Sequence, residues 1–258
     1  ARRIELLDEW GIDATVMFPS SGLAFDAQMS ARPDAACAAA TAFNRWIEED
    51  WGFGHDGRIY AAPFISLQVV ERACAELERV LALGARVVQV RLGAVNGRSP
   101  AHPALDPFWA RVQEAGLTVV VHAGDSGYSG NGYFDDKFTA NFSGQSMGPT
   151  IKMLQFERAV FDFLASLVFD RFFTRFPGIR LASVENGSEF LPDLFRKLRS
   201  QHRRIPGFFP EDPTETFRRN VWINPFWEDD PYEIAELMGT DRVIFGSDWP
   251  HIEGMPHP

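Results

Sequence analysis

The sequence predicts an α/β fold, a (β/α)8 barrel of the metal-dependent hydrolase type whose first strand is missing from the chain. Short apolar, β-branched runs alternate with amphipathic segments along all 258 residues. Such alternation is typical of a parallel sheet that is covered by helices on both faces. Several of these runs also end on a side chain with metal-ligand or acid–base chemistry, as the strands of α/β barrels do at their carboxyl ends.

Seven candidate strands follow one another along the chain. Each is an apolar run that stops at Gly, Pro or polar residues. They cover residues 14–18, 59–65, 86–92, 117–122, 178–184, 220–224 and 243–245. A closed barrel needs one strand more. Because residues 1–11 are helix-like, we expect the missing strand to precede them, and we expect one domain over 1–258 that is truncated at both ends.

Helix-like segments fill the intervals between these strands. Residues 33–51, 70–83 and 156–173 place apolar side chains at helical spacing. A doubly wound open sheet is the alternative architecture, but the first strand is followed by Pro-Ser-Ser-Gly instead of a phosphate-binding glycine motif. Residues 124–148 are rich in Gly, Ser and Asn and exceed an ordinary barrel connection, which predicts a lid.

The composition excludes several classes of function. The formal net charge is −10 and the pI is about 5.1, so the clustered Lys and Arg of a nucleic-acid-binding protein are missing. No apolar stretch approaches the roughly 20 residues of a membrane helix. Cys37 and Cys74 lie in helix-like segments without metal-ligand spacing. We therefore expect a cytoplasmic protein that acts on a small molecule, without nucleic acid or membrane partners.

Two strand ends carry metal-ligand side chains. The run 117–122 reads LTVVVH and ends on His122, and the run from Val243 leads through Gly246 to Asp248. Imidazole nitrogen and carboxylate oxygen are standard ligands of Zn²⁺ and similar ions. Taken singly, His122 is equally explained as a core histidine bonded to a carbonyl, and Asp248 as the cap of a turn. Glu185 adds a carboxylate after the run 178–184.

Three motifs resemble the amidohydrolase superfamily, in the amidohydrolase-related branch that includes aminocarboxymuconate-semialdehyde decarboxylase and γ-resorcylate decarboxylase. They are VVVHAGD at 119–125, FDRFFTRFPGIRLASVENG at 169–187 and RVIFGSDWPH at 242–251. Their order and separation match the fifth, sixth and eighth strands of that branch. The resemblance implies a distorted barrel with one divalent ion, commonly Zn²⁺ with Mn²⁺ as the alternative. It implies that His122 and Asp248 bind the metal, and that the protein forms a homodimer.

The chain also departs from the pattern of this branch. The His-x-His or Glu-x-His motif of the first strand is absent, and Glu185 stands where the family commonly has histidine. The fourth strand reads VVQVRLG, with Arg91 and without the lysine of two-metal members, which favours one metal. Glu185 can still handle a proton, although it is anionic near neutral pH unless its surroundings raise its pKa.

Three functions remain open at this point. The resemblance favours non-oxidative decarboxylation of a small unsaturated or aromatic carboxylate, with Asp248 as proton shuttle, Glu185 as a catalytic group and His251 as a further acid. A metal-dependent hydrolase of small amides, lactones or esters is the second, and a degenerate, non-catalytic barrel is the third. The candidate substrate contacts, each of which is also explained by packing or turn formation, are Arg91, Asn224, Trp249, Phe18 and Asn186.

Overall fold

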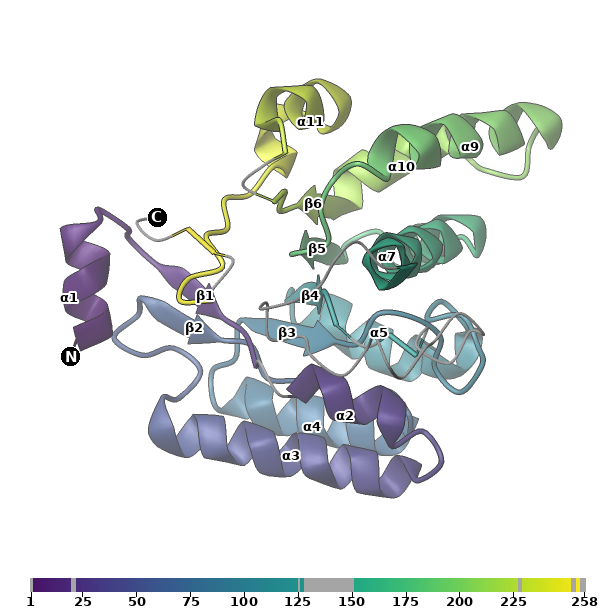
Figure 1. The fold of residues 1–258 in the computed structure, drawn as a ribbon. Coiled ribbons are helices and arrows are strands. Elements are labelled where there is room, and N and C mark those ends of the chain that lie inside the picture. Colours follow the sequence, from purple (N-terminus) through teal and green to yellow (C-terminus); the bar gives the residue numbers. More distant parts are fainter. Residues whose placement is uncertain are drawn as a thin grey trace.

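A computed structural model of the chain describes residues 2–19, 22–124, 126–127, 151–226, 229–251 and 254–255. The predicted lid over 124–148 lies outside the described residues, except for Gly124, Ser126 and Gly127. Every strand pair is parallel, and strands alternate with helices along the chain (Figure 1). The α/β architecture with parallel sheets is therefore confirmed.

The strands follow one another in chain order. A two-stranded sheet holds β1 and β2, and a four-stranded sheet has the order β3-β4-β5-β6. Isolated parallel bridges extend this order, from Phe64 to Gln89 in β3 and from Ile223 in β6 to Val243. The strand bounds are β1 Thr15–Met17, β2 Ile59–Ala61, β3 Val87–Val90, β4 Thr118–His122, β5 Arg180–Val184 and β6 Val221–Ile223.

The expected strand over 243–245 is not formed. Within the described part of the chain, this segment meets β6 through the bridge at Val243 and a bond from Ile244 N–H to the Ile223 carbonyl at 2.9 Å. Phe245 is 71% exposed, so the apolar run that predicted a buried strand ends in solvent. Since β1 likewise pairs on one edge only, the described strands form an open parallel array in barrel order.

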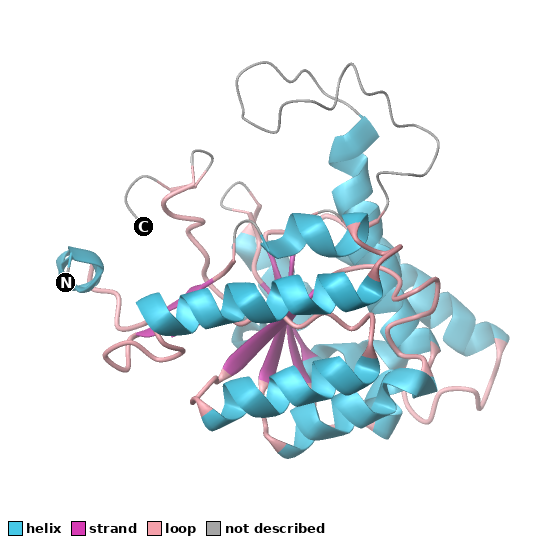
Figure 2. Cartoon of the chain, turned by 90° about the horizontal axis from the view of Figure 1, so that it is seen from below, coloured by secondary structure: helices cyan, strands magenta, loops and turns pink. Residues whose placement is uncertain are grey.

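Helices cover the outer face of this array (Figure 2). In Figure 1, α3 and α4 lie below β1 to β3, and α1 stands apart at the left edge beside the C-terminal segment. None of the described helices is long and apolar enough to cross a membrane. The helix bounds are α1 Arg2–Glu9, α2 Gly22–Gln28, α3 Pro33–Asp50, α4 Val70–Ala82, α5 Asp106–Glu114, α7 Ile151–Phe169, α8 Phe172–Arg175, α9 Leu191–Arg204, α10 Pro213–Asn220 and α11 Pro231–Met238, with 3-10 turns at Pro103–Leu105 and Thr240–Arg242.

The strands separate two apolar clusters. Val119 and Val121 of β4 pack with the large cluster that the helices complete. Val120 points to the opposite face and packs with Ala62 and Ala182 in a smaller cluster. Because side chains alternate along a strand, residue 122 shares the inner face with residue 120. This alternation directs His122 into the array.

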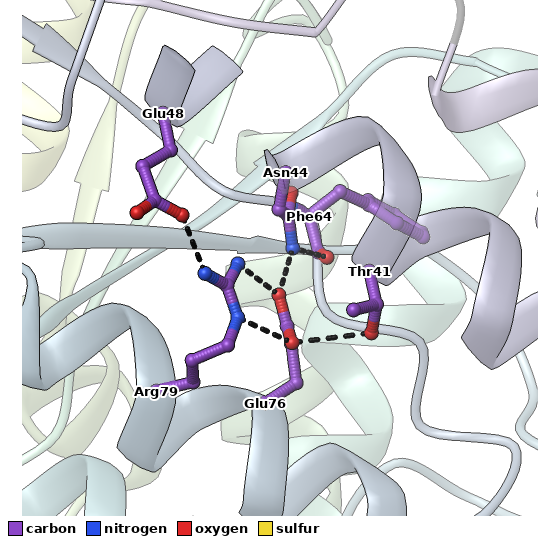
Figure 3. A network of polar contacts seen from close by, with 6 residues as sticks. All are labelled: Thr41, Asn44, Glu48, Phe64, Glu76 and Arg79. Atoms are coloured by element: carbon purple, nitrogen blue, oxygen red, sulfur yellow. Dashed lines mark hydrogen bonds and ion pairs between the residues drawn. The ribbon is translucent and has the colours of Figure 1, made fainter. Parts of the chain in front are cut away.

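A buried polar network fixes α3 and α4 to the chain just after β2 (Figure 3). The Asn44 carboxamide donates to the Phe64 carbonyl at 2.9 Å and accepts from the Phe64 N–H at 2.9 Å. Asn44 also donates to Glu76 Oε1 at 2.9 Å, and Arg79 donates to both Glu76 oxygens. Glu48 accepts a further bond from Arg79 at 2.6 Å. A side chain thus stands in for a strand partner where β1 has ended.

Candidate active site

His122 ends β4 and meets Glu185, which follows β5. The two strands pair in register, with His122 opposite Val184, so the next residue of β5 falls beside the imidazole. His122 Nε2 lies 2.7 Å from Glu185 Oε2, and the side chains are 16% and 25% exposed. His122 Nδ1 lies 2.8 Å from the Ala123 carbonyl oxygen. Since that carbonyl only accepts, Nδ1 carries a proton and Nε2 faces the carboxylate.

The surroundings raise the pKa of His122. Burial alone would lower it, because a charged imidazolium loses hydration. The hydrogen bond to Glu185 and the negative charge of that carboxylate outweigh burial, and the Ala123 carbonyl and the charge of Asp248 act in the same direction. The site therefore favours an imidazolium with Glu185 as its counter-ion.

Asp248 belongs to the same centre. Its charge acts on His122, and its Oδ2 lies 3.3 Å from Nδ1 of His251, whose side chain is 53% exposed. The backbone of Asp248 is left-handed, with φ 53°, and so is that of Glu185, with φ 56°. Such conformations cost residues other than glycine about 1 to 3 kcal/mol each. Both candidate acid–base carboxylates thus sit on strained backbone at the carboxyl ends of neighbouring chain segments.

Asn224 links the backbone of Glu185 to the segment that leads to Asp248. The Glu185 N–H donates to Asn224 Oδ1 at 3.3 Å, and Asn224 Nδ2 donates to the carbonyls of Pro225 at 3.0 Å and Ile244 at 3.4 Å. The sequence predicted a contact with substrate for this side chain. Its polar atoms instead bind backbone groups, which makes Asn224 a positioning residue.

Two other predicted substrate contacts are engaged in the scaffold. The Arg91 guanidinium donates to buried Asp26 at 2.7 Å and to the carbonyls of Leu92, Ala94 and Ser126. Four of its five N–H groups are used in this way. Asn186 is buried, and its Nδ2 donates to carbonyls of β4 and β5 and to a β5 hydroxyl. Neither side chain is held ready for a substrate.

The aromatic candidates divide between the site and its periphery. The Phe18 ring lies 5.3 Å from the His122 ring, so Phe18 borders the site as expected. The Trp249 ring packs edge-on against Trp10 at 5.2 Å, with the Arg3 guanidinium 5.4 Å from its centroid. Trp249 therefore faces α1, and the expectation that it contacts substrate has no support from these contacts.

Sequence reasoning missed the partners of these side chains. Asp26, which neutralises Arg91, lies 65 positions away from it, and no local pattern marks the pair. Arg3 and Trp10 were assigned only to a helix. The pairing of His122 with Glu185 was within reach, because consecutive barrel strands are neighbours and both residues follow strand ends.

The donors at this site fit a divalent ion in part. An imidazole whose Nδ1 is tied to a backbone carbonyl presents Nε2 for coordination, and carboxylate oxygens suit Zn²⁺ and Mn²⁺. Among the described residues, however, no group of three or more His, Cys, Asp or Glu side chains is arranged to hold a metal ion. His122, Glu185 and Asp248 have the right chemistry, but they do not form a complete ligand set in this arrangement.

Comparison with known proteins agrees with the geometry. A family model described as amidohydrolase matches residues 3–258. The chain superposes on the crystal structure of an amidohydrolase from Mycobacterium avium subsp. paratuberculosis K-10 with a TM-score of 0.89 and 41% identity, over 99% of this chain and 65% of the other. The chain thus spans about two thirds of the length of that protein. No curated protein matched.

Two decarboxylases share the fold at lower identity. The 5-carboxyvanillate decarboxylase of Sphingomonas paucimobilis has a TM-score of 0.64 and 18% identity, over 97% of this chain and 72% of its own. The dihydroxybenzoic acid decarboxylase of Polaromonas sp. JS666, solved with manganese and 2-nitroresorcinol, has a TM-score of 0.64 and 17% identity, over 99% and 76%. At these identities the likeness shows the fold alone.

Proposed function

Because this chain belongs to the amidohydrolase family, we propose that it is a metal-dependent, non-oxidative decarboxylase of small unsaturated or aromatic carboxylates. The observation that carries the proposal is the contact of His122 with Glu185 at 2.7 Å, with Asp248 acting on the same imidazole. A carboxylate pair around one histidine at the carboxyl ends of parallel strands supplies the groups for proton transfer.

The resident metal supports binding of the substrate. When bound, one divalent ion supplies a positive charge that holds a substrate oxygen and polarises the adjoining bonds. His122 through Nε2 and Asp248 through its carboxylate are the residues proposed to hold it. The family resemblance favours Zn²⁺, whereas the manganese in the Polaromonas decarboxylase supports Mn²⁺.

Asp248 carries the proton in the proposed reaction. Its protonated carboxyl group donates a proton to the ring carbon that bears the substrate carboxylate, and the bond from that carbon to the carboxylate breaks. Carbon dioxide leaves, the electron pair of the broken bond restores the ring, and Asp248 becomes a carboxylate. His251, half exposed and 3.3 Å from Asp248, is placed to return a proton from solvent.

Glu185 and Phe18 prepare the site for this step. Glu185 balances the charge of His122, which keeps the imidazole oriented between the Ala123 carbonyl and the carboxylate. The Phe18 ring beside His122 offers an apolar face to a planar substrate. An aromatic acid therefore suits the described surroundings.

A metal-dependent hydrolase is the second candidate. The 41% identical Mycobacterium protein is described as an amidohydrolase, which favours hydrolysis of a small amide, lactone or ester. In that reaction Asp248 accepts a proton from the attacking water and delivers it to the leaving group. The same residues thus serve both reactions, and the product distinguishes them.

The test compares products on protein supplemented with Mn²⁺ or Zn²⁺. Carbon dioxide release from 2,6-dihydroxybenzoate and 5-carboxyvanillate is measured beside hydrolysis of small lactones and amides. Carbon dioxide release supports the decarboxylase, and hydrolysis alone supports the second candidate. Protein that holds metal and turns over neither class supports the non-catalytic barrel. A cytoplasmic location, a small-molecule substrate and a homodimer remain part of the proposal.

A further inference from the structure

The chain segment that carries Asp248 has few backbone anchors. Ile244 N–H bonds to the Ile223 carbonyl, and beyond it none of the N–H groups of residues 245–247 donates to another described residue. The turn that follows is closed by the bond from His251 N–H to the Asp248 carbonyl at 2.8 Å. A proton-carrying side chain must be held within about 0.5 Å of its productive position, and this backbone alone supplies little of that restraint.

Helix α1 contacts this segment directly after Asp248. The Trp10 ring meets the Trp249 ring at 5.2 Å, edge to face with an interplanar angle of 77°. The Arg3 guanidinium carbon lies 5.4 Å from the centroid of Trp249 and 5.4 Å from the centroid of Trp51, which follows α3. One cation thus bridges two indole rings from distant parts of the chain.

The bridge leads back to the rigid part of the molecule. Trp51 directly follows α3, and α3 is tied to the chain after β2 by the bonds between Asn44 and Phe64. A guanidinium between two indoles, together with an edge-to-face indole pair, restrains the Trp249 ring from both neighbours. The neighbouring residue Asp248 is restrained with it. This accounts for a helix that lies apart from the sheet yet beside the C-terminal segment (Figure 1).

We infer that Arg3 and Trp10 are positioning residues for Asp248: they hold Trp249 and thereby keep the Asp248 carboxylate facing His122 and Glu185. The inference rests on the proposed function only for its effect on turnover. Its effect on the segment itself is a property of the folded chain. The two can therefore be measured separately.

The first measurement is hydrogen–deuterium exchange of peptides that cover residues 244–251. Arg3→Ala should speed exchange at the His251 amide about threefold to tenfold, as expected for loss of one cation–π bridge. Arg2→Ala is the matched control, because Arg2 is an exposed neighbour in the same helix whose ion pairs join only Glu5 and Glu9. Arg3→Lys, which keeps the cation, should restore part of the protection. Unchanged exchange in Arg3→Ala would overturn the inference.

The second measurement is turnover on the metal-loaded protein. Arg3→Ala and Trp10→Phe should lower kcat several-fold with KM within about twofold, since Asp248 is displaced while the substrate pocket remains, and Arg3→Lys should recover part of kcat. Faster exchange with unchanged kcat would contradict the positioning role. Absence of turnover in the unsubstituted protein would count against the proposed function, and the exchange result would then decide the inference alone.

Discussion

Gly246 lies against the side chain of Asn224, so closely that a Cβ atom at position 246 would stand 2.4 Å from Asn224 Nδ2. Asn224 cannot swing aside without losing its bonds to the Glu185 N–H and the Ile244 carbonyl. We expect Gly246→Ala to destabilise the protein by about 1 to 3 kcal/mol and to lower turnover with it. Thermal unfolding measures the first effect. Gly54→Ala, whose Cβ would meet Tyr60 at an ordinary 3.9 Å, should be nearly neutral.

Asp248→Asn should abolish turnover. The amide preserves the shape of the side chain but can neither donate nor accept the transferred proton, so the expected loss is at least about 100-fold in kcat. Carbon dioxide release from the preferred acid is the measurement. Asp241→Asn, an exposed carboxylate of the preceding turn, serves as the control. Retained activity in Asp248→Asn would show that the proton comes from elsewhere.

His122→Ala should remove bound metal. Because the described residues hold no group of three donor side chains suited to a metal, we expect the unsubstituted chain to bind Mn²⁺ weakly and the variant not to bind it at this site. Electron paramagnetic resonance of free Mn²⁺ in a titration separates the two cases. His55→Ala removes a histidine outside the site and should leave the titration unchanged. Equal binding by His122→Ala would refute the ligand assignment.

Glu185→Gln should lower the pKa of His122 in metal-free protein. Burial lowers that pKa, and the bond and charge of Glu185 are the main influences that reverse it. A group whose pKa is raised on folding stabilises the protein below its unfolded pKa, and this contribution is lost as pH rises through the folded value. The stability gap between the two proteins should therefore shrink at high pH. Nitrogen-15 NMR follows the imidazole, with exposed Glu189→Gln as control.

Glu76→Gln should destabilise the joint between α3 and α4 at neutral pH. Burial would raise the pKa of Glu76, but bonds from Arg79 and Asn44 outweigh it and hold the pKa below its usual value. The contribution of this carboxylate is thus complete above its unfolded pKa and is lost as pH falls through the folded value. We expect a loss of about 1 to 3 kcal/mol at pH 7.

Urea unfolding across pH checks this expectation. The difference between Glu76→Gln and the unsubstituted protein should narrow below about pH 4.5, where an unfolded glutamate takes up its proton. Glu78→Gln alters an exposed carboxylate of the same helix, which pairs with Arg111 at 3.0 Å, and should cost little at any pH. A difference that does not depend on pH would contradict the role of the Glu76 charge.

The sequence could predict elements whose signal is local. The valine run before His122 formed a buried strand where expected, because β-branched residues enclosed on both faces have few alternatives. The run from Val243 has similar composition, yet it formed only a bridge, since a strand also needs neighbours along its edges. Edge pairing is decided by distant residues and leaves no trace in a short window.

The site followed the same division. The ends of β4 and β5 placed His122 and Glu185 together, as strand order predicts. The assignment of Arg91 to substrate failed to anticipate Asp26, a buried carboxylate on a helix far earlier in the chain. A buried cation takes the nearest available anion, and which anion is nearest is a property of the folded molecule.

The left-handed backbone at Glu185 and Asp248 has a price in folding that an inert scaffold would have no reason to retain. Glycine at either position would relax the chain and raise its stability, so the two carboxylates are kept against the preference of the fold. Variants that fold better than the unsubstituted protein should therefore be found at these two positions, and they should be the ones that do least chemistry. Such a trade of stability for reactivity speaks for a working enzyme.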